Sequence, residues 1–446
     1  MHTARTPLES LACQWSLLFK RPMGLFQFIE GRLFFTALVL VVCAGCGAAK
    51  IGPTEPGVCR ATLAALDPSW RPPKSIRFQM SERAWSHAES GESELAISSG
   101  LKEMAELVGG DDARVKMLWD NSVEAFLNTA YASRHNDPMT SWALEIADLN
   151  FKIIARPYLG ETAHPTSCLH SADYLALAVY ALELDARLGR AEKGSALTTQ
   201  LVRRTNLAIA DCGGLTNLLG FDPKVALKDK NAANGTVYSW VMWSVTLLDA
   251  LAKPAIQLPD GSSKFVGHVW RFLSTYRVPL ARNSPDGMNR DDVYDAAYLM
   301  THIGYIPTGY GRHQLFVHDG PWLYRYIREN YYAAMQLGEL DLFAEFVDLL
   351  RQYGCTEDND AQLRHGSRYL MHLYRRAGRQ WLKHREPYEG VHVSDYDALH
   401  KPWTAIAGLR RRIFEPTKTL SYRAAFERAI LSGQSSTVYK QPLTKE

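Results

Sequence analysis

The fold is decided by helical hairpins, and "YYAAMQLGELDLFAEFVDLL" (residues 331–350) is the plainest of them. Apolar residues recur every three or four positions in both halves of this stretch, which is the spacing of one face of a helix. A tight turn separates the two halves. The stretch therefore predicts two antiparallel helices that bury their apolar faces together.

The same helix–turn–helix pattern occurs elsewhere, in "AFLNTAYASRHNDPMTSWALEIADLNFKIIA" (125–155) and in the segment 170–211. Helical periodicity also marks "YSWVMWSVTLLDALA" (238–252) and "WLYRYIRENYYAAM" (322–335), with breaks at glycine and proline. Alternating, strand-like runs are scarce, and a short extended piece near "HQLFV" (313–317) predicts no sheet. The predicted fold class is all-α.

Two architectures are built from serial helical hairpins. An open α-solenoid of the tetratricopeptide kind has a constant repeat of about 34 residues, and no such period is found in this chain. Over roughly residues 80–415 the chain loosely resembles α/α-toroid proteins in size, irregular hairpin length and aromatic content. The resemblance implies a ring of hairpins, and we favour the toroid for a single all-α domain spanning residues 80–432.

The N-terminal residues have the order of a secretory signal. Lys20, Arg21 and Arg32 precede the apolar run "LFFTALVLVVCAG", which small residues follow. The ending "CAGC" (43–46) resembles the lipobox of bacterial lipoproteins, although Cys43 stands where that family usually has an aliphatic residue. The resemblance implies a signal peptide over 1–45, lipidation of Cys46 and a place in the bacterial cell envelope, on the periplasmic face of the outer membrane. An uncleaved signal anchor is the alternative.

Residues 46–79 are rich in proline and glycine and predict a tether, and residues 433–446 predict a polar tail. The chain has 50 basic and 47 acidic residues, so its net charge of +3 gives no reason to expect nucleic acid as a partner. The expected partners are the membrane, through the lipid, and a glycan or other small-molecule substrate.

Four cysteines remain after the signal, in a compartment that permits disulfides. Cys168 precedes one helix of the 170–211 hairpin and Cys212 follows the other, so an antiparallel pair brings their sulfurs together. We therefore predict the disulfide Cys168–Cys212. Cys59 and Cys355 are left, and the sequence leaves open whether they pair.

The candidate catalytic residues begin with "YDAAYLMTH" (294–302). Asp295, Tyr298 and His302 fall on one predicted helix face, where a carboxylate, a phenol and an imidazole can exchange protons with a substrate. The alternative is a core histidine bonded to a neighbouring carbonyl group. A second set, Glu345 and Asp348, shares a helix face with Arg351, which suggests either a buried ionic brace or half of a carboxylate pair with Asp295.

The candidate substrate-binding residues are polar and aromatic side chains near these two sets. Arg312 is expected to bind acid groups, and Trp322 and Trp403 to stack on sugar rings; Tyr305, His313 and His400 complete this prediction. No HExxH, CxxC, phosphate-loop or dinucleotide motif occurs, so no metal and no cofactor is predicted.

The segment "AHPTSCLHSADY" (163–174) supplies His164, His170, Asp173 and Tyr174 next to the predicted disulfide. The two histidines have an alternative reading as surface residues near a pinned turn.

Together these features predict a lipid-anchored envelope enzyme that cleaves a polysaccharide by hydrolysis or elimination. A non-catalytic helical scaffold that binds proteins or peptides is the main alternative, because a groove of Tyr and Trp suits protein recognition equally well. A helical metalloenzyme that uses His302, His400 and helix acids is the second alternative. An enzyme requires the residues of 294–313, 329–348 and 392–403 to meet in one place.

Overall fold

The computed structural model describes residues 57–62, 78, 80–109, 138–160, 163–190, 195–276, 290–384, 395–412, 414 and 421–434. Within these ranges the chain is helical and contains no strand, which confirms the predicted all-α class. The predicted signal peptide, residues 46–56, 63–77 and 79 of the predicted tether, which include Cys46, and the tail from residue 435 lie outside the described residues. None of the described helices is long and apolar enough to cross a membrane.

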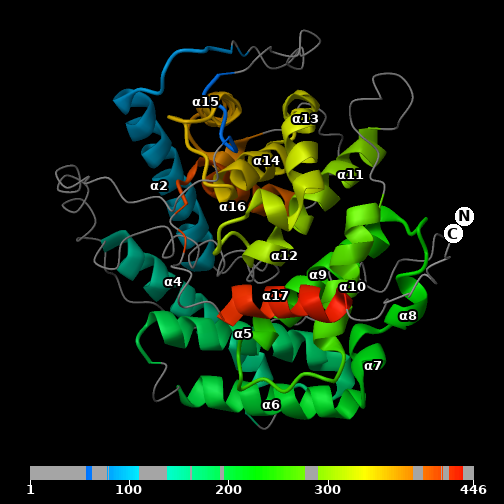
Figure 1. Ribbon diagram of the computed structural model, residues 1–446. Coiled ribbons are helices and arrows are strands. Elements are labelled where there is room, and N and C mark those ends of the chain that lie inside the picture. The colour runs from blue at the N-terminus through cyan, green and yellow to red at the C-terminus, as the bar shows by residue number, and fades with distance from the viewer. Residues whose placement is uncertain are drawn as a thin grey trace, which may run out of the picture.

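The helices follow one another through the chain (Figure 1). They are α2 (His87–Gly109), α4 (Pro138–Ala155), α5 (Ser171–Arg187), α6 (Ala196–Cys212), α7 (Leu215–Leu219), α8 (Pro223–Ala226), α9 (Asn234–Leu251), α10 (Ser262–Thr275), α11 (Arg290–Ile303), α12 (Tyr305–Thr308), α13 (Pro321–Leu337), α14 (Leu340–Gln352), α15 (Ala361–Arg376), α16 (Asp395–Leu409) and α17 (Ser421–Gln434). Short 3₁₀ turns are η3 (Arg156–Tyr158), η4 (Cys168–His170), η6 (Val317–Asp319) and η7 (Trp381–Lys383).

The two hairpins predicted over 331–350 and 170–211 are present. Helices α13 and α14 are joined through Gly338, whose φ of +78° is the left-handed conformation that glycine adopts at a helix C-terminus without steric cost. Helices α5 and α6 pack together, and the disulfide Cys168–Cys212 links their ends as predicted. The nonapeptide 294–302 lies entirely within α11.

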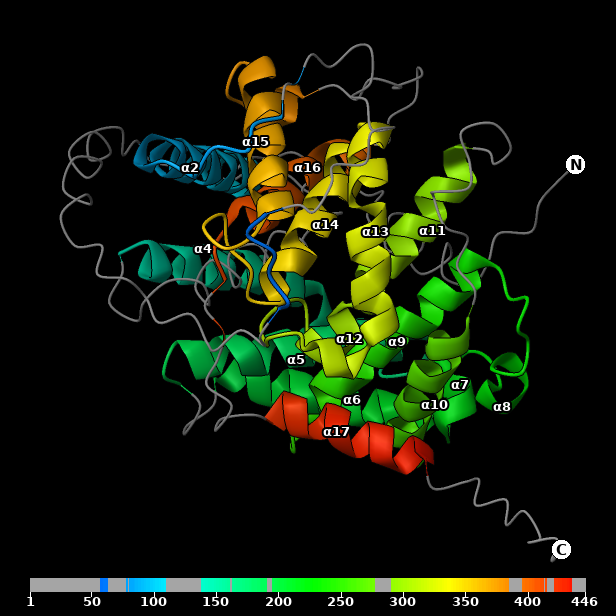
Figure 2. The same cartoon turned by 45° about the horizontal axis from the view of Figure 1, so that its top comes forward.

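Helices that are far apart in the sequence pack against each other. Helix α17 lies along α10 and next to α9, and α2 packs against α16 (Figures 1 and 2). The buried apolar side chains form one large core around α9, α10, α11, α13, α14 and α15. A smaller core forms where α2, α4, α5, α6 and α16 meet. The site described below lies against the larger core.

Residues 57–62 are fixed to the folded body. The disulfide Cys59–Cys355 joins this segment to the end of α14, across 296 residues of chain. The Val58 carbonyl oxygen accepts hydrogen bonds from the Tyr324 hydroxyl (2.6 Å) and from Arg328 Nη2 (2.7 Å). The predicted tether is therefore wrong for these six residues, because a covalent bond and buried hydrogen bonds pin them. The sequence left open whether Cys59 and Cys355 pair, and the structure contains this disulfide.

The crossing of α10 and α17 depends on two glycines. A Cβ on Gly267 would lie 2.1 Å from the Ala429 carbonyl oxygen, and a Cβ on Gly433 would lie 2.9 Å from the Gly267 Cα. Since two helix backbones meet here, neither side can yield without moving a helix.

We therefore expect Gly267→Ala to lower the free energy of unfolding by about 2 kcal/mol or more, measured by urea denaturation. The matched control is Gly91→Ala, at a helical glycine of α2 with nothing within 4 Å of an added Cβ. That substitution is expected to raise stability by about 0.5–1 kcal/mol, because alanine has the higher helix propensity. Equal effects of the two substitutions would contradict the close approach of α10 and α17.

Candidate functional site

One face of α11 carries a ladder of three rings. Tyr294, Tyr298 and His302 are spaced by four residues, which places them above one another along the helix. The Tyr294 and Tyr298 rings stack with their centroids 5.6 Å apart, and the Tyr298 and His302 rings lie 4.2 Å apart. Tyr294 and Tyr298 are half-buried, whereas His302 is only 5% exposed. The ladder leads from the partly exposed part of the helix to a buried imidazole.

Other helices complete the aromatic surroundings of His302. Tyr238 of α9 lies 4.9 Å from the His302 ring and 5.9 Å from the Tyr298 ring. Tyr305 of α12 meets the imidazole edge-on at 5.2 Å, and Tyr310 packs on Tyr305 at 4.9 Å. We call these six residues the His302 cluster: Tyr238, Tyr294, Tyr298, His302, Tyr305 and Tyr310. Four of its tyrosines are half-buried and Tyr305 is buried, and three of the rings, those of Tyr238, Tyr298 and Tyr305, contact the imidazole.

The imidazole of His302 is oriented by its Nδ1. This atom lies 2.9 Å from the Tyr298 carbonyl oxygen, and because a carbonyl only accepts hydrogen bonds, Nδ1 carries the proton. In the neutral ring Nε2 is therefore the basic nitrogen. Glu345 Oε2 lies 3.6 Å from Nδ1, and the Thr301 hydroxyl hydrogen bonds to Glu345 Oε2 while lying 3.2 Å from Nδ1.

This arrangement suits proton transfer at Nε2. When Nε2 takes a proton, the ring becomes a cation next to Glu345, which is 2% exposed. An ionised carboxylate in such a desolvated position stabilises the imidazolium more strongly than it would in water. The structural alternative predicted for His302, a histidine bonded to a neighbouring carbonyl, is correct for Nδ1. That hydrogen bond places the proton of the neutral ring on Nδ1, so that Nε2 is the nitrogen that can take up a further proton.

Tyr310 has an unusual backbone. Gly309, Tyr310 and Gly311 have φ of +56°, +58° and +78°, and a tyrosine in this region has an energetic cost of about 1–2 kcal/mol. Neighbouring bonds hold the turn: Thr308 Oγ1 accepts from the Gly311 N–H at 3.1 Å and donates to the Gly304 carbonyl at 2.8 Å. Strained residues held in this way concentrate at functional sites. Here the strain places the Tyr310 ring against Tyr305.

The predicted acidic partners of His302 are not arranged as expected. Asp295 is exposed. The residue that continues the row of Tyr298 and His302 along α11 is its neighbour Tyr294, whose ring stacks on that of Tyr298. Asp348 accepts two hydrogen bonds from Arg412, at 2.8 and 2.7 Å, and one from Gln352 Nε2. Both are buried, so Asp348 forms the ionic brace that was the alternative to its catalytic prediction, with Arg412 as partner.

Arg351 was the expected partner for Glu345 and Asp348. Its guanidinium instead bonds to Glu357 at 2.5 Å, to the Ser367 hydroxyl and to the Gly408 carbonyl. Of the two predicted acids on α14, only Glu345 reaches the His302 cluster.

Arg312 and His313 lie in a separate group of charged residues. Arg312 pairs with Asp249 and lies 3.7 Å from Glu183, and its Nε donates to the Gly309 carbonyl at 2.7 Å. These ion pairs replace the predicted role of Arg312 in binding substrate acids. His313 is buried and stacks on Tyr422 at 5.3 Å. Burial and the Arg312 charge lower the pKa of His313 to about 3.

Glu183 is the centre of this charged group. Lys253 Nζ lies 2.6 Å from Glu183 Oε2, and Arg187 Nε lies 3.5 Å from Glu183 Oε1. Desolvation raises the pKa of Glu183, but the charges of Lys253 and Arg312 outweigh it and lower the pKa from 4.5 to about 2. The fold therefore gains stability from the ionised form, and this gain is complete above pH 4.5 and lost as the pH falls towards 2.

We expect Glu183→Gln to remove this acid dependence. The wild-type free energy of unfolding should fall by up to about 3 kcal/mol more than that of the variant between pH 4.5 and pH 2. Urea denaturation at a series of pH values measures this difference. Parallel curves for the two proteins over this range would show that Glu183 does not contribute as described.

The predicted tryptophan platforms lie elsewhere. Trp403 is 6% exposed and belongs to the smaller core with Ile406 and Leu101, so it is a packing residue. Trp322 is half-buried and its ring lies 5.8 Å from that of Trp270 on α10. His400 belongs to α16, but its side chain lies outside the described residues. The expected meeting of 392–403 with 294–313 is thus not seen for Trp403.

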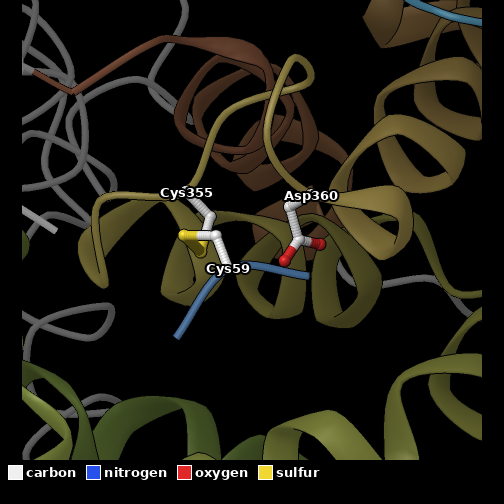
Figure 3. Close-up of side chains that lie close together, drawn as sticks. All are labelled: Cys59, Cys355 and Asp360. Atoms are coloured by element: carbon white, nitrogen blue, oxygen red, sulfur yellow. A yellow bond between two sulfur atoms is a disulfide. The ribbon is translucent and has the colours of Figure 1, made fainter. Parts of the chain in front are cut away.

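One group of three potential metal ligands is occupied by other bonds. Cys59, Cys355 and Asp360 have donor atoms within 4.8 Å of one another (Figure 3). The two sulfurs are bonded to each other. Asp360 accepts from Arg328 at 2.6 and 3.1 Å and caps α15 through the Leu363 N–H. The group is explained by a disulfide and an ion pair.

A second set of titratable side chains gathers near the Cys168–Cys212 disulfide. The His164 and His170 rings lie 4.9 Å apart, and His170 Nδ1 is 3.8 Å from Asp173 Oδ2. The Tyr158 ring lies 5.0 Å from that of His164, and burial together with the nearby Asp173 raises the pKa of the Tyr158 hydroxyl. We call His164, His170, Asp173 and Tyr158 the His164 cluster. The sequence suggested the first three, and the structure adds Tyr158 from η3.

Sequence reasoning did not single out Tyr294, Thr301 or Tyr238 of the His302 site. Thr301 stands inside the quoted nonapeptide, but only the packing of α11 on α14 shows that its hydroxyl reaches Glu345. Tyr238 stands about sixty residues earlier, in a helix that is otherwise strongly apolar, and no local pattern connects it to residue 302. The one feature of the sequence that could have drawn attention to Tyr238 is that a tyrosine stands in this apolar helix.

The site thus draws residues from α9, α11, α12 and α14 and from the turn after α12. Its chemistry rests on one oriented imidazole, one buried carboxylic acid and five phenols. Comparison of the chain with protein-family models, with curated proteins and with solved structures gave no match.

Proposed function

We propose that the chain is an enzyme that cleaves a polysaccharide by proton transfer, with His302 as the base. The observation that carries the proposal is the His302 cluster: an imidazole oriented by the Tyr298 carbonyl, backed by Glu345 and in contact with the rings of Tyr238, Tyr298 and Tyr305. A core histidine needs neither the buried acid nor the aromatic surroundings.

The aromatic rings support a sugar as the substrate. Tyr238 and Tyr294 each lie nearly parallel to Tyr298, with interplanar angles of 20° and 13°. Flat aromatic faces bind the apolar faces of sugar rings, and phenol hydroxyls bond to sugar hydroxyls. The half-buried tyrosines therefore act as the binding surface in this proposal.

The disposition of the acids favours elimination over hydrolysis. Glycoside hydrolysis ordinarily uses two carboxyl groups on either side of the scissile bond. Asp348 is bound to Arg412, and the described partners of Glu345 are the Thr301 hydroxyl and the His302 imidazole, an arrangement that places an acid beside a histidine. Elimination needs a base that removes a carbon-bound proton and an acid that protonates the departing oxygen as the carbon–carbon double bond forms. His302 is the base and Tyr298, whose ring centroid lies 4.2 Å from that of the imidazole, is the acid.

The proposal includes the architecture and the location. The packing of α2 on α16 and of α17 on α10 brings distant segments together, which supports a closed toroid over an open solenoid. The signal-like N-terminus and the "CAGC" motif support lipid anchoring through Cys46 in the bacterial envelope.

The test is incubation of the purified chain with a panel of neutral and uronate-containing polysaccharides. We expect new reducing ends together with the ultraviolet absorbance of an unsaturated sugar, which elimination produces and hydrolysis does not. Reducing ends without this absorbance would replace elimination by hydrolysis. If no polysaccharide is cleaved while one is bound, or proteins are bound instead, the chain is a binding scaffold and the enzymatic proposal is wrong.

A further inference from the structure

We propose that Arg312 is a positioning residue of the His302 site, and that it acts by holding Tyr310 as a binding surface for the sugar. The inference rests on the proposed function, because it assigns a role within that site. It deepens that function by identifying which tyrosine is held in place at an energetic cost and which residue holds it. The basis is the geometry of the turn of residues 309–311, which follows α12.

Tyrosine stands in this turn at a position where glycine would be less strained. Residues 309, 310 and 311 are consecutive left-handed residues, with φ of +56°, +58° and +78°, and the outer two are glycines. Glycine adopts this conformation without steric cost, whereas a side chain crowds the backbone. Among the described residues, the other non-glycine residue with a positive φ is Arg379, in the turn after α15. A tyrosine kept in this conformation indicates that its ring has a use that offsets the strain.

Arg312 binds the first residue of the turn and anchors it to a neighbouring helix. Its Nε donates to the Gly309 carbonyl oxygen at 2.7 Å, and its Nη2 donates to Asp249 of α9. The same helix carries Tyr238 of the site. A guanidinium makes such bonds together because its donors lie in one rigid plane, which a lysine ammonium group does not reproduce. Arg312 thus connects the strained turn to a helix of the site.

A second guanidinium lies against the other end of the turn. Arg412 Nη1 lies 3.4 Å from the Gly311 carbonyl oxygen, and a Cβ on Gly311 would lie 2.8 Å from Arg412 Cζ. In the same way, a Cβ on Gly309 would lie 2.7 Å from Arg312 Nη2. Arg412 is paired with Asp348 of α14, the helix that also carries the buried acid of the site. The turn is therefore enclosed between two ion-paired arginines, and its glycines leave room for them.

The ring that this turn presents is half-buried. It packs on Tyr305 with the ring centroids 4.9 Å apart, and Tyr305 contacts the imidazole of His302. A partly exposed phenol offers a ring surface and a hydroxyl group to a sugar. The alternative is that Tyr310 only packs on Tyr305. The two roles differ in what a substitution changes, which is sugar binding in the first case and the stability of the fold in the second.

The experiment measures the melting temperature of the full chain, together with KM and kcat for a polysaccharide that the wild type cleaves. Tyr310→Gly is expected to raise KM about 3–10-fold, the usual contribution of one aromatic contact, with a smaller effect on kcat. Its melting temperature should stay within about 3 °C of the wild type or rise, because glycine relieves the strain. Tyr310→Phe keeps the ring and should bring KM back towards the wild-type value.

The matched control is Arg379→Gly, which relieves the same kind of backbone strain at an exposed residue, with φ of +62°, outside the site. Its melting temperature should likewise stay the same or rise. Its KM should be unchanged, because no sugar-binding ring is lost. The comparison separates the relief of strain from the loss of the ring.

Arg312→Lys tests the positioning role. Lysine keeps a positive charge near Asp249 but does not hold the Gly309 carbonyl at the same time. On its own, this substitution should raise KM about as much as Tyr310→Gly does. Combined with Tyr310→Gly it should raise KM no further, because it acts through the same ring. If Arg312→Lys does not fold, Gly309→Ala takes its place, since the added Cβ displaces the guanidinium from the other side.

The outcomes separate this inference from the proposed function. A wild-type chain that cleaves no polysaccharide overturns both. If the wild type cleaves, but Tyr310→Gly changes KM less than threefold or lowers the melting temperature by more than about 3 °C, Tyr310 is a packing residue and only this inference is wrong. Increases in KM that multiply in the double variant would overturn the positioning role of Arg312.

Discussion

Replacing His302 with asparagine is expected to lower kcat for the polysaccharide by about 10²–10⁴-fold, the usual contribution of a general base. Asparagine can still donate to the Tyr298 carbonyl as Nδ1 does, but it has no basic nitrogen at the position of Nε2. KM should change little, because the tyrosines that bind the sugar remain. Initial rates over a range of substrate concentrations separate the two constants.

The control for this substitution is His313→Asn. His313 is also a buried histidine of the same segment, but it stacks on Tyr422 and lies in the charged group around Glu183. Its replacement should leave kcat within about twofold once folding has been verified, because it contacts no member of the His302 cluster among its described ring partners. A His302→Asn variant that keeps more than a tenth of the wild-type kcat would refute its assignment as the base.

Glu345→Gln tests the group behind the imidazole. Glutamine keeps the shape of the side chain and a hydrogen bond to Thr301, but it cannot supply a negative charge near Nδ1 when the imidazole takes up a proton. We expect kcat to fall by about tenfold or more, because the imidazolium formed at His302 loses its counter-charge, with KM nearly unchanged. A residue with only a packing role would leave the rate unaffected in a folded variant.

The all-α class could be predicted because helical periodicity is a local property. Any helix that buries one face needs apolar residues three and four positions apart. The hairpin of residues 331–350 can therefore be predicted from its own sequence, without knowledge of the residues around it. The disulfide Cys168–Cys212 followed from the same local logic, since the ends of an antiparallel hairpin must meet. Helices and their immediate pairing are encoded in short stretches of sequence.

The partners of buried polar groups could not be predicted in this way. The spacing of Glu345, Asp348 and Arg351 shows that they share a face, but the residues opposite that face belong to other helices. Asp348 pairs with Arg412, 64 positions away. In the same way, Asp295 and Tyr294 are neighbours in sequence, and only the packing of α11 decides which of them joins His302.

Replacing Arg328 with methionine is expected to lower the free energy of unfolding by about 3–5 kcal/mol. Arg328 is 7% exposed and Asp360 is fully buried, and the two form a double hydrogen bond at 2.6 and 3.1 Å. The guanidinium also donates to the Val58 carbonyl and the Gln362 amide oxygen. Methionine fills much of the same space, but it leaves a buried carboxylate without its cation and strands two further acceptors.

The matched control lies one turn away on the same helix. Arg325 of α13 is exposed, so Arg325→Met should change stability by no more than about 0.5 kcal/mol in the same urea denaturation experiment with disulfides intact. Adding Asp360→Asn to Arg328→Met should recover part of the loss, because it removes the unpaired charge. If the two arginine variants are equally stable, the N-terminal segment is not held by this ion pair. In that case the Cys59–Cys355 disulfide and the other hydrogen bonds of the segment, such as that from the Tyr324 hydroxyl to the Val58 carbonyl, hold it in place.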